Sequence, residues 1–458
     1  MVSKYYMILV LMVLAIPYES HAITSKATSS MRFVSSFLIY LGGGDAIKNK
    51  DIELLSKFDL IVFDRFRYKN VNNNTWKELK KVNNDIKILL YQNGAEVSDN
   101  TDKQKPYFLN NIGRLNISRG NHSGSVSQNK EWFLTNDLGV RLKNKLNEHS
   151  YLLDYGNKEF KEYWVESTIE DIVKKPWKAD GIMIDNCATA KINIVNKLLL
   201  NKPNKYSDAK SFDTALNGFL NYATAKLNQN QQMVMPNRTN SRLIDGEKAW
   251  LELDKSHHPP DIVFDEGAFS VSWGAGDVQF YSHEEWLRQV LLPSKIKNSS
   301  VAFLSHTGLK PDEKGVSSNG NSVSFEQIYW YSLGSYLLAK RETAPYTLFG
   351  FDYDRNKHGD YKRISWFDVY SNLNLGKAQG VAIPVSEKNK DIYFREFKTG
   401  YVYVNPLNTE VNDIPVVSEN VVILDMKLNG ELRYKELRAK NKMSMKAHTT
   451  VILLKRKS

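Results

Sequence analysis

Short, almost continuously apolar runs recur along the first three quarters of the chain, separated by longer amphipathic stretches. Strands that are covered on both faces have this pattern, and such strands belong to parallel sheets. We therefore predict eight buried parallel strands, over residues 37–41, 60–63, 86–91, 182–185, 233–235, 262–264, 301–304 and 346–351.

The stretches between these runs favour helices. We predict helices over residues 50–58, 160–174, 211–228, 283–292 and 325–341. A strand followed by a helix, repeated eight times, predicts an α/β fold of the (β/α)8 TIM-barrel type, which we place at residues 31–375. Residues 94–151 are rich in Asn, Ser and Gly and predict a long loop on the face where the strands end.

The pattern changes near residue 380. Short, partly alternating runs follow one another there, separated by Asn, Gly and Pro turns, at residues 392–397, 400–405, 421–425, 431–437 and 449–454. Alternation over such lengths is typical of half-buried antiparallel strands. We predict a small C-terminal antiparallel β-sandwich domain over residues 380–458.

The first residues predict a targeting segment. Lys4 precedes an apolar run at residues 5–17, and Ser20-His21-Ala22 supplies a small-x-small cleavage signal. The run is too short to span a bilayer and fits a secretory signal peptide over residues 1–22; a buried N-terminal helix is the alternative. No later run reaches transmembrane length, so we expect a secreted or periplasmic protein without membrane insertion after signal cleavage.

Charge and cysteine content narrow the classes of partner and cofactor. The chain carries 62 Lys and Arg against 51 Asp and Glu, a net charge of +11 that attracts polyanions. These charges are spread along the chain without a nucleic-acid-binding motif, so we expect no nucleic-acid partner. Cys187 is the only cysteine, which excludes an intramolecular disulfide and a Cys/His zinc cluster. We read it as a buried thiol rather than a nucleophile, and expect no metal or organic cofactor. The oligomeric state stays open.

Two of the predicted strands end in acidic residues. Asp185 closes the fourth strand, and Glu266 follows the sixth. Because the carboxyl ends of barrel strands meet at one mouth, these two acids are expected to face the same cleft. A strand-end Asp also caps the turn that follows it. Asp265 competes with Glu266, since neighbouring residues of a strand point to opposite sides.

Further polar residues stand at the ends of predicted strands, where they could hydrogen-bond sugar hydroxyls or simply stabilise loops. They are Asp64, Arg65, Tyr91, Gln92, Asn93, Asn186, Asn237, Arg238 and His306. Trp273 and Trp286 are candidates for a sugar-stacking platform, although core packing is the commoner fate of Trp.

Four of these segments carry a family resemblance. Residues 60–66, 88–94, 180–186 and 264–268 resemble glycosyl hydrolase-like family fifteen, a group expected to form (β/α)8 barrels, and the resemblance extends over residues 37–351. More distantly, the arrangement is similar to that of endo-α-1,4-polygalactosaminidase-like hydrolases, whose catalytic acids stand at the ends of the fourth and sixth strands. The resemblance implies the same roles for Asp185 and Glu266.

The sequence thus favours a glycoside hydrolase that acts on a polysaccharide or oligosaccharide. Asp185 would be the nucleophile or base and Glu266 the general acid. The alternative is a non-catalytic polysaccharide-binding protein on the same scaffold, or an envelope protein that uses its basic surface. Carboxyl groups more than about 10 Å apart would favour the binding protein. The sugar, the linkage, endo or exo action and the anomeric outcome stay open.

Overall fold

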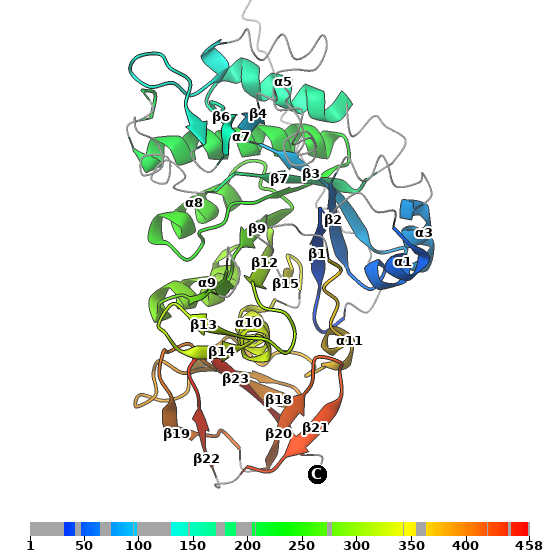
Figure 1. Ribbon diagram of the computed structural model, residues 1–458, viewed down its shortest axis with the longest axis vertical. Coiled ribbons are helices and arrows are strands. Elements are labelled where there is room, and N and C mark those ends of the chain that lie inside the picture. Colours follow the sequence, from blue (N-terminus) through cyan, green and yellow to red (C-terminus); the bar gives the residue numbers. More distant parts are fainter. Residues whose placement is uncertain are drawn as a thin grey trace, which may run out of the picture. The chain divides into compact units, whose positions relative to one another are not determined.

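The computed structural model describes most of the chain beyond residue 31. The described residues are 32–41, 47–64, 75–94, 96–98, 130–144, 147–170, 179–188, 204–206, 208–272, 277–341, 343–353, 363–418, 420–437 and 441–456. The chain from Arg32 onward forms one compact unit (Figure 1). The predicted signal peptide at residues 1–22 lies outside the described residues.

Eight parallel strands form two sheets. The first sheet has the order β1 (Phe37–Tyr40), β2 (Leu60–Asp64), β3 (Lys87–Asn93), β7 (Gly181–Asp185) and β8 (Met233–Pro236). The second has the order β15 (Thr347–Tyr353), β12 (Ser300–Thr307) and β9 (Ile262–Glu266). Each strand coincides with one of the eight apolar runs, so the mixed α/β class with parallel strands is confirmed.

Two single parallel bridges join these sheets. One links Asn237, just after β8, to Phe264 of β9, and the other links Ser36, just before β1, to Phe349 of β15. One cluster of buried apolar side chains draws members from all eight strands, among them Phe37, Met183 and Met235. The strands therefore share one interior.

Eight helices are described: α1 (Asn49–Leu55), α3 (Thr75–Val82), α5 (Lys158–Thr168), α7 (Ala209–Gln229), α8 (Ile244–Asp254), α9 (His283–Lys295), α10 (Phe325–Ala339) and α11 (Val369–Asn372). Polar caps fix several of their starts, because a side-chain oxygen there satisfies a free backbone N–H. Asn157, Asp208, Ser282 and Ser324 accept such bonds at the starts of α5, α7, α9 and α10. Five helices overlap predicted ones; α3, α8 and α11 were missed.

Aspartates stand directly before three of the parallel strands and tie them to a neighbour. Asp59 accepts a hydrogen bond from the backbone N–H of Ser36 at 2.7 Å. Asp180 and Asp261 do the same with Ile88 and Val234, each at 2.8 Å. Burial raises the pKa of Asp59 and of Asp261 above the usual value. These aspartates fix the register at the base of the sheets.

Shorter strands elaborate the framework. The region predicted as a long loop contains η1 (Lys130–Trp132) and an antiparallel sheet of β4 (Glu96–Ser98), β6 (Asn147–Leu152) and β5 (Lys143–Asn144). A four-stranded sheet follows β9 in the chain, with β10 (Ser270–Val271), β11 (Asp277–Phe280), β13 (Lys314–Ser317) and β14 (Ser322–Ser324).

The C-terminal region is antiparallel, as predicted. Its main sheet has the order β16 (Ile383–Pro384), β17 (Tyr393–Phe397), β18 (Gly400–Asn405), β23 (Thr449–Lys455), β20 (Val421–Met426) and β21 (Leu432–Lys435). A second sheet pairs β19 (Val411–Pro415) with β22 (Lys442–Met445). The main sheet packs against α10 (Figure 1), where Gly334 is required, because a Cβ there would lie 2.1 Å from Oγ1 of Thr450. The domain boundary near residue 380 stays a prediction.

No helix among the described residues is both long and apolar enough to cross a membrane.

Candidate active site

Strand β7 carries Asp185 to the edge of the first sheet. The strand lies so close to β8 that a Cβ at Gly181 would stand 2.3 Å from the carbonyl oxygen of Met233. Ile182, Met183 and Ile184 are buried, whereas Asp185 is partly exposed. Asn186 follows with a φ of 61°, a left-handed conformation that turns the chain out of the sheet. Asp185 is thus the last residue in the strand.

Strand β9 delivers Glu266 in the same way. Glu266 is its last residue and is partly exposed. The neighbouring Asp265 is fully buried and accepts hydrogen bonds from the hydroxyl of Ser241 and from Nε2 of Gln289, the latter at 3.0 Å. Asp265 therefore faces the opposite side of the strand, and Glu266 is the acid that faces Asp185.

Asn237 connects the two carboxylates. This residue follows β8, which runs between β7 and β9, and its Nδ2 donates to Oδ1 of Asp185 at 2.9 Å and to Oε2 of Glu266 at 2.7 Å. Two oxygens bound to one nitrogen at these distances lie at most about 5.6 Å apart. The structure therefore brings together the two acids that the sequence singled out.

Tyr91 completes the surroundings of Asp185. It lies in β3, and its hydroxyl donates a hydrogen bond to Oδ2 of Asp185. Desolvation raises the pKa of Asp185 above its usual value, and the negative charge of Glu266 raises it further. The hydrogen bonds from Tyr91 and Asn237 act in the opposite direction because they stabilise the carboxylate. The two acids are thus electrostatically linked.

Buried groups hold the turn that follows Asp185. The hydroxyl of Tyr155 donates to the carbonyl oxygen of Asn186 at 3.0 Å. The fully buried Arg238 donates through Nη1 to the carbonyl oxygen of Cys187 at 2.8 Å, and its Nη2 lies 3.6 Å from Oδ1 of Asp213. Sequence reasoning missed Tyr155, because it precedes α5 and stands at no strand end.

Other predicted site residues lie along the same edge. Asn93 pairs in register with Asp185, and its carbonyl oxygen accepts a hydrogen bond from Nε1 of Trp164 at 3.0 Å. Asp64 ends β2 and pairs in register with Tyr91, but its side chain lies outside the described part of the chain. Arg65 and Trp273 also lie outside the described residues.

Two candidates occupy the interior instead. His306 has no exposed surface, and its Nδ1 accepts a hydrogen bond from the backbone N–H of Ser272 at 3.2 Å. Such a position fits a structural histidine better than a sugar ligand. Trp286 is also fully buried, and its Nε1 donates to Oγ of Ser335 at 2.8 Å. Of the two fates considered for Trp286, core packing is the one found, because the ring is buried between α9 and α10.

The described residues do not meet the requirements of a metal site. Among them, no group of three or more His, Cys, Asp and Glu side chains is placed to hold a metal ion. Cys187 is a buried thiol that takes part in no disulfide.

Two carboxyl groups this close, at the ends of the two parallel strands that flank β8, are the arrangement that glycoside hydrolases use. The model of hypothetical glycosyl hydrolase family 15 matches residues 80–401, well over half of the chain. The chain belongs to this family, which confirms the resemblance seen in the sequence. The protein is thus a glycoside hydrolase by class, and its specificity is open.

More distant likenesses exist among solved structures. A trehalose-6-phosphate hydrolase of Bacillus licheniformis is 10% identical, with a TM-score of 0.49 and coverage of 92% of this chain and 99% of that one. An Anoxybacillus α-amylase is 11% identical, with a TM-score of 0.46 and coverage of 93% and 98%. Ega3 of Aspergillus fumigatus, in complex with galactosamine, is 8% identical, with a TM-score of 0.37 and coverage of 72% and 94%. These values are too low to support an argument. No curated protein matches the chain in sequence.

Proposed function

We propose that the protein is a retaining glycoside hydrolase of a polysaccharide or oligosaccharide, with Asp185 as nucleophile and Glu266 as general acid and base. The observation that carries this proposal is the shared amide of Asn237, which limits the nearest carboxyl oxygens to about 5.6 Å. Retaining enzymes hold their carboxyl groups about 5–5.5 Å apart and inverting enzymes about 6.5–9.5 Å. The short separation also counts against the non-catalytic binding protein.

The reaction has two steps. Glu266 protonates the glycosidic oxygen while Asp185 attacks the anomeric carbon, so that the bond to the leaving sugar breaks and a glycosyl ester of Asp185 forms. Glu266, now a carboxylate, then takes a proton from a water molecule that attacks the same carbon and releases Asp185. Tyr91 and Asn237 orient Asp185 and stabilise it as an anion before attack and after release.

The raised pKa of Asp185 favours a second assignment, in which Asp185 is the acid and Glu266 the nucleophile. Against this, Asp185 accepts hydrogen bonds from both Tyr91 and Asn237, which is the support a nucleophilic carboxylate needs.

Activity and roles can be tested together. Reducing ends released from a panel of polysaccharides identify a substrate, and Asp185→Ala and Glu266→Ala should each lower kcat/KM by roughly 10²–10⁴-fold. Azide should rescue Asp185→Ala with inversion at the anomeric carbon, and Glu266→Ala with retention, on an aryl glycoside of that sugar. Retention with Asp185→Ala and inversion with Glu266→Ala would instead establish Glu266 as the nucleophile and Asp185 as the acid. Asp245→Asn, on the exposed face of α8, is the matched control.

Full activity in both variants would refute the proposed function. Inversion by the unaltered enzyme, observed by NMR of the first product, would refute the retaining mechanism while leaving the hydrolase assignment in place.

We further propose that the eight parallel strands close into a (β/α)8 barrel. The single bridges from Asn237 to Phe264 and from Ser36 to Phe349 support closure at both seams, as does the interior cluster shared by all strands. Asp185 and Glu266 then stand at the carboxyl-terminal face, where barrel enzymes hold their active sites.

Export remains part of the proposal. The signal-like segment at residues 1–22 supports a secreted or periplasmic enzyme. Expression of the full chain in a bacterial host, followed by mass spectrometry of the secreted fraction, should find a mature N-terminus at Ile23. An intact N-terminus in the cytosolic fraction alone would contradict export.

A further inference from the structure

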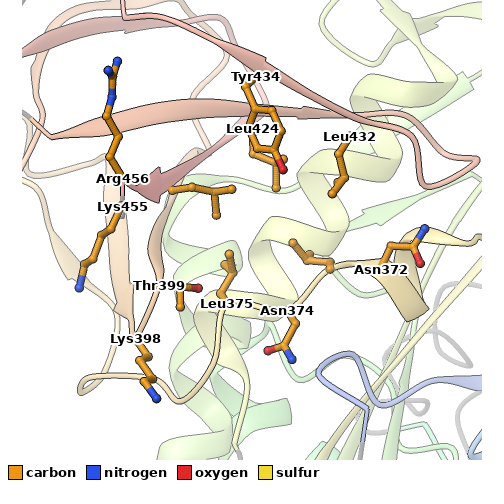
Figure 2. Close-up of a pocket in the computed structure, with 12 residues that line it drawn as sticks. Asn372, Asn374, Leu375, Lys398, Thr399, Leu424, Leu432, Tyr434, Lys455 and Arg456 are labelled. Atoms are coloured by element: carbon orange, nitrogen blue, oxygen red, sulfur yellow. The ribbon is translucent and has the colours of Figure 1, made fainter. Parts of the chain in front are cut away.

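A pocket lies on the C-terminal sheet (Figure 2). Its volume is about 420 Å³, which falls in the range of small-molecule sites, about 300–1,000 Å³. Strands β20, β21 and β23 form one wall, and the β17–β18 turn and the loop after α11 form the other. The pocket shares no residue with the carboxylate site.

The strand wall is apolar and open to solvent. Leu432 and Tyr434 stand two residues apart on β21, the edge strand of the sheet, so both side chains point to the same face. Their exposed fractions are 42% and 58%. Leu424 of β20 lies directly opposite Tyr434 and extends this surface inward. An exposed ring beside aliphatic side chains is a platform for a flat, partly apolar ligand.

Hydrogen-bond donors border the facing wall. Figure 2 shows Thr399 and Asn374 across the pocket from Tyr434, with Lys398 at the rim. The ammonium group of Lys398 forms no ion pair with any of the described residues. Lys455 and Arg456 also line the pocket, where they form ion pairs with Glu396 and Glu436, and no Asp or Glu is among the described residues that line it. The pocket therefore suits a ligand that is rich in acceptor oxygens and carries no positive charge.

Backbone hydrogen bonds fix the two walls in place. The N–H of Thr399 donates to the carbonyl oxygen of Leu375, and the N–H of Lys455 to that of Thr399, each at 3.0 Å. Nδ2 of Asn372 donates to the carbonyl oxygen of Gly430 at 3.2 Å. A pocket built this way loses little conformational freedom when a ligand enters.

We propose that this pocket binds a neutral or acidic glycan segment at a distance from the active site. The apolar C–H face of a sugar ring matches Tyr434 and Leu432, while its hydroxyl or carboxylate oxygens match the amide of Asn374, the hydroxyl of Thr399 and the ammonium of Lys398. The glycan class rests on the proposed function, because a polymer substrate is long enough to reach a second site.

Native affinity gels test this proposal. The full chain with Glu266→Gln, which prevents digestion, is run through gels that contain soluble starch, polygalacturonate or chitosan. Starch or polygalacturonate should retard the protein, and Tyr434→Ala should weaken that binding roughly tenfold through loss of ring stacking. Lys398→Ala should weaken it less. Ile383→Ala, an exposed apolar residue on the opposite edge strand, and Lys435→Ala, on the other face of β21, are matched controls and should change nothing.

Three results would overturn the proposal. They are no retardation in the starch and polygalacturonate gels, equal retardation of the parent and Tyr434→Ala, or retardation by chitosan that depends on Tyr434. A fall in mass on Tyr434→Ala in sedimentation would instead assign this face to contact between two copies of the chain. Release of reducing ends tests the hydrolase separately, so failure of one proposal is distinguishable from failure of the other.

Discussion

Replacing Asn237 by alanine removes the amide that donates to both carboxylates. Two unit charges about 5 Å apart repel by about 3 kcal/mol at an effective dielectric constant of about 20. A hydrogen bond to a charged group offsets about 1.5–3 kcal/mol of such a cost. Asp185 and Glu266 are partly exposed, so water screens part of this effect, and we take the lower value. About 1.4 kcal/mol corresponds to one pKa unit.

The expected result is a displaced pH–rate profile. Without the amide, the anionic form of the nucleophile is less stable, so its pKa rises by about one unit. Activity requires that group to be ionised, and the acidic limb of kcat/KM should therefore move to higher pH by about one unit. The measurement is the initial rate of reducing-end release between pH 3 and 9.

A matched control separates this effect from general destabilisation. Asn217→Ala removes another partly buried amide, which donates to the carbonyl oxygen of Ala249 at 3.2 Å in the interface of α7 and α8. It should leave the pH profile unmoved. An Asn237→Ala enzyme with an unshifted acidic limb would refute the claim that this amide sets the ionisation of the pair.

Three further changes test other parts of the structure. Tyr91→Phe removes a donor to Asp185, so kcat should fall roughly tenfold and the acidic limb should again move to higher pH; an unchanged kcat would contradict the contact. Asp261→Ala leaves the buried N–H of Val234 without its acceptor and should lower the free energy of unfolding in urea by about 1–3 kcal/mol, whereas Asp261→Asn keeps an acceptor. Because the folded pKa of Asp261 is raised, its stabilisation of the wild type is complete below the usual Asp pKa and is lost as pH rises through the raised value. The free energy of unfolding of Asp261→Asn should therefore rise relative to that of the wild type as pH increases. A difference between the two that does not change with pH would contradict this. Gly334→Ala forces a Cβ against Thr450 and should lower Tm by an amount equivalent to about 1–3 kcal/mol. An unchanged Tm would contradict the packing of the C-terminal sheet on α10.

The sequence predicts the parallel strands well because each is buried on both faces and reads as a continuous apolar run. The strand 400–405 is also found with its predicted bounds, since tight turns flank it. Helix α3 was missed because it is short and four of its eight residues are charged. The small strands β4, β5 and β6 lie in an Asn-, Ser- and Gly-rich stretch, where pairing partners rather than local pattern determine structure.

The site was predictable in position but not in contacts. A carboxylate at the end of an apolar strand identifies Asp185 and Glu266, and the same rule places Asn237 at the same edge. That Asn237 bridges both acids depends on the order of β7, β8 and β9 and on side-chain rotamers, which no local pattern contains. The sequence likewise left open whether Trp286 stacks on a sugar or packs in the core, since a Trp on an amphipathic helix does not show which neighbour covers it.

Strands β7 and β9 each lie between two acids. The acid before the strand is hydrogen-bonded to the backbone of a neighbouring strand, and the acid that ends the strand belongs to the proposed active site. Asp180 precedes the strand that ends in Asp185, and Asp261 precedes the strand that ends in Glu266. A slip of one residue along either strand would carry its reactive acid about 3.3 Å, enough to abolish attack on a bound sugar. Loss of the hydrogen bond made by Asp180 or Asp261, at the opposite end of the strand, would thus lower the turnover rate before it unfolded the protein.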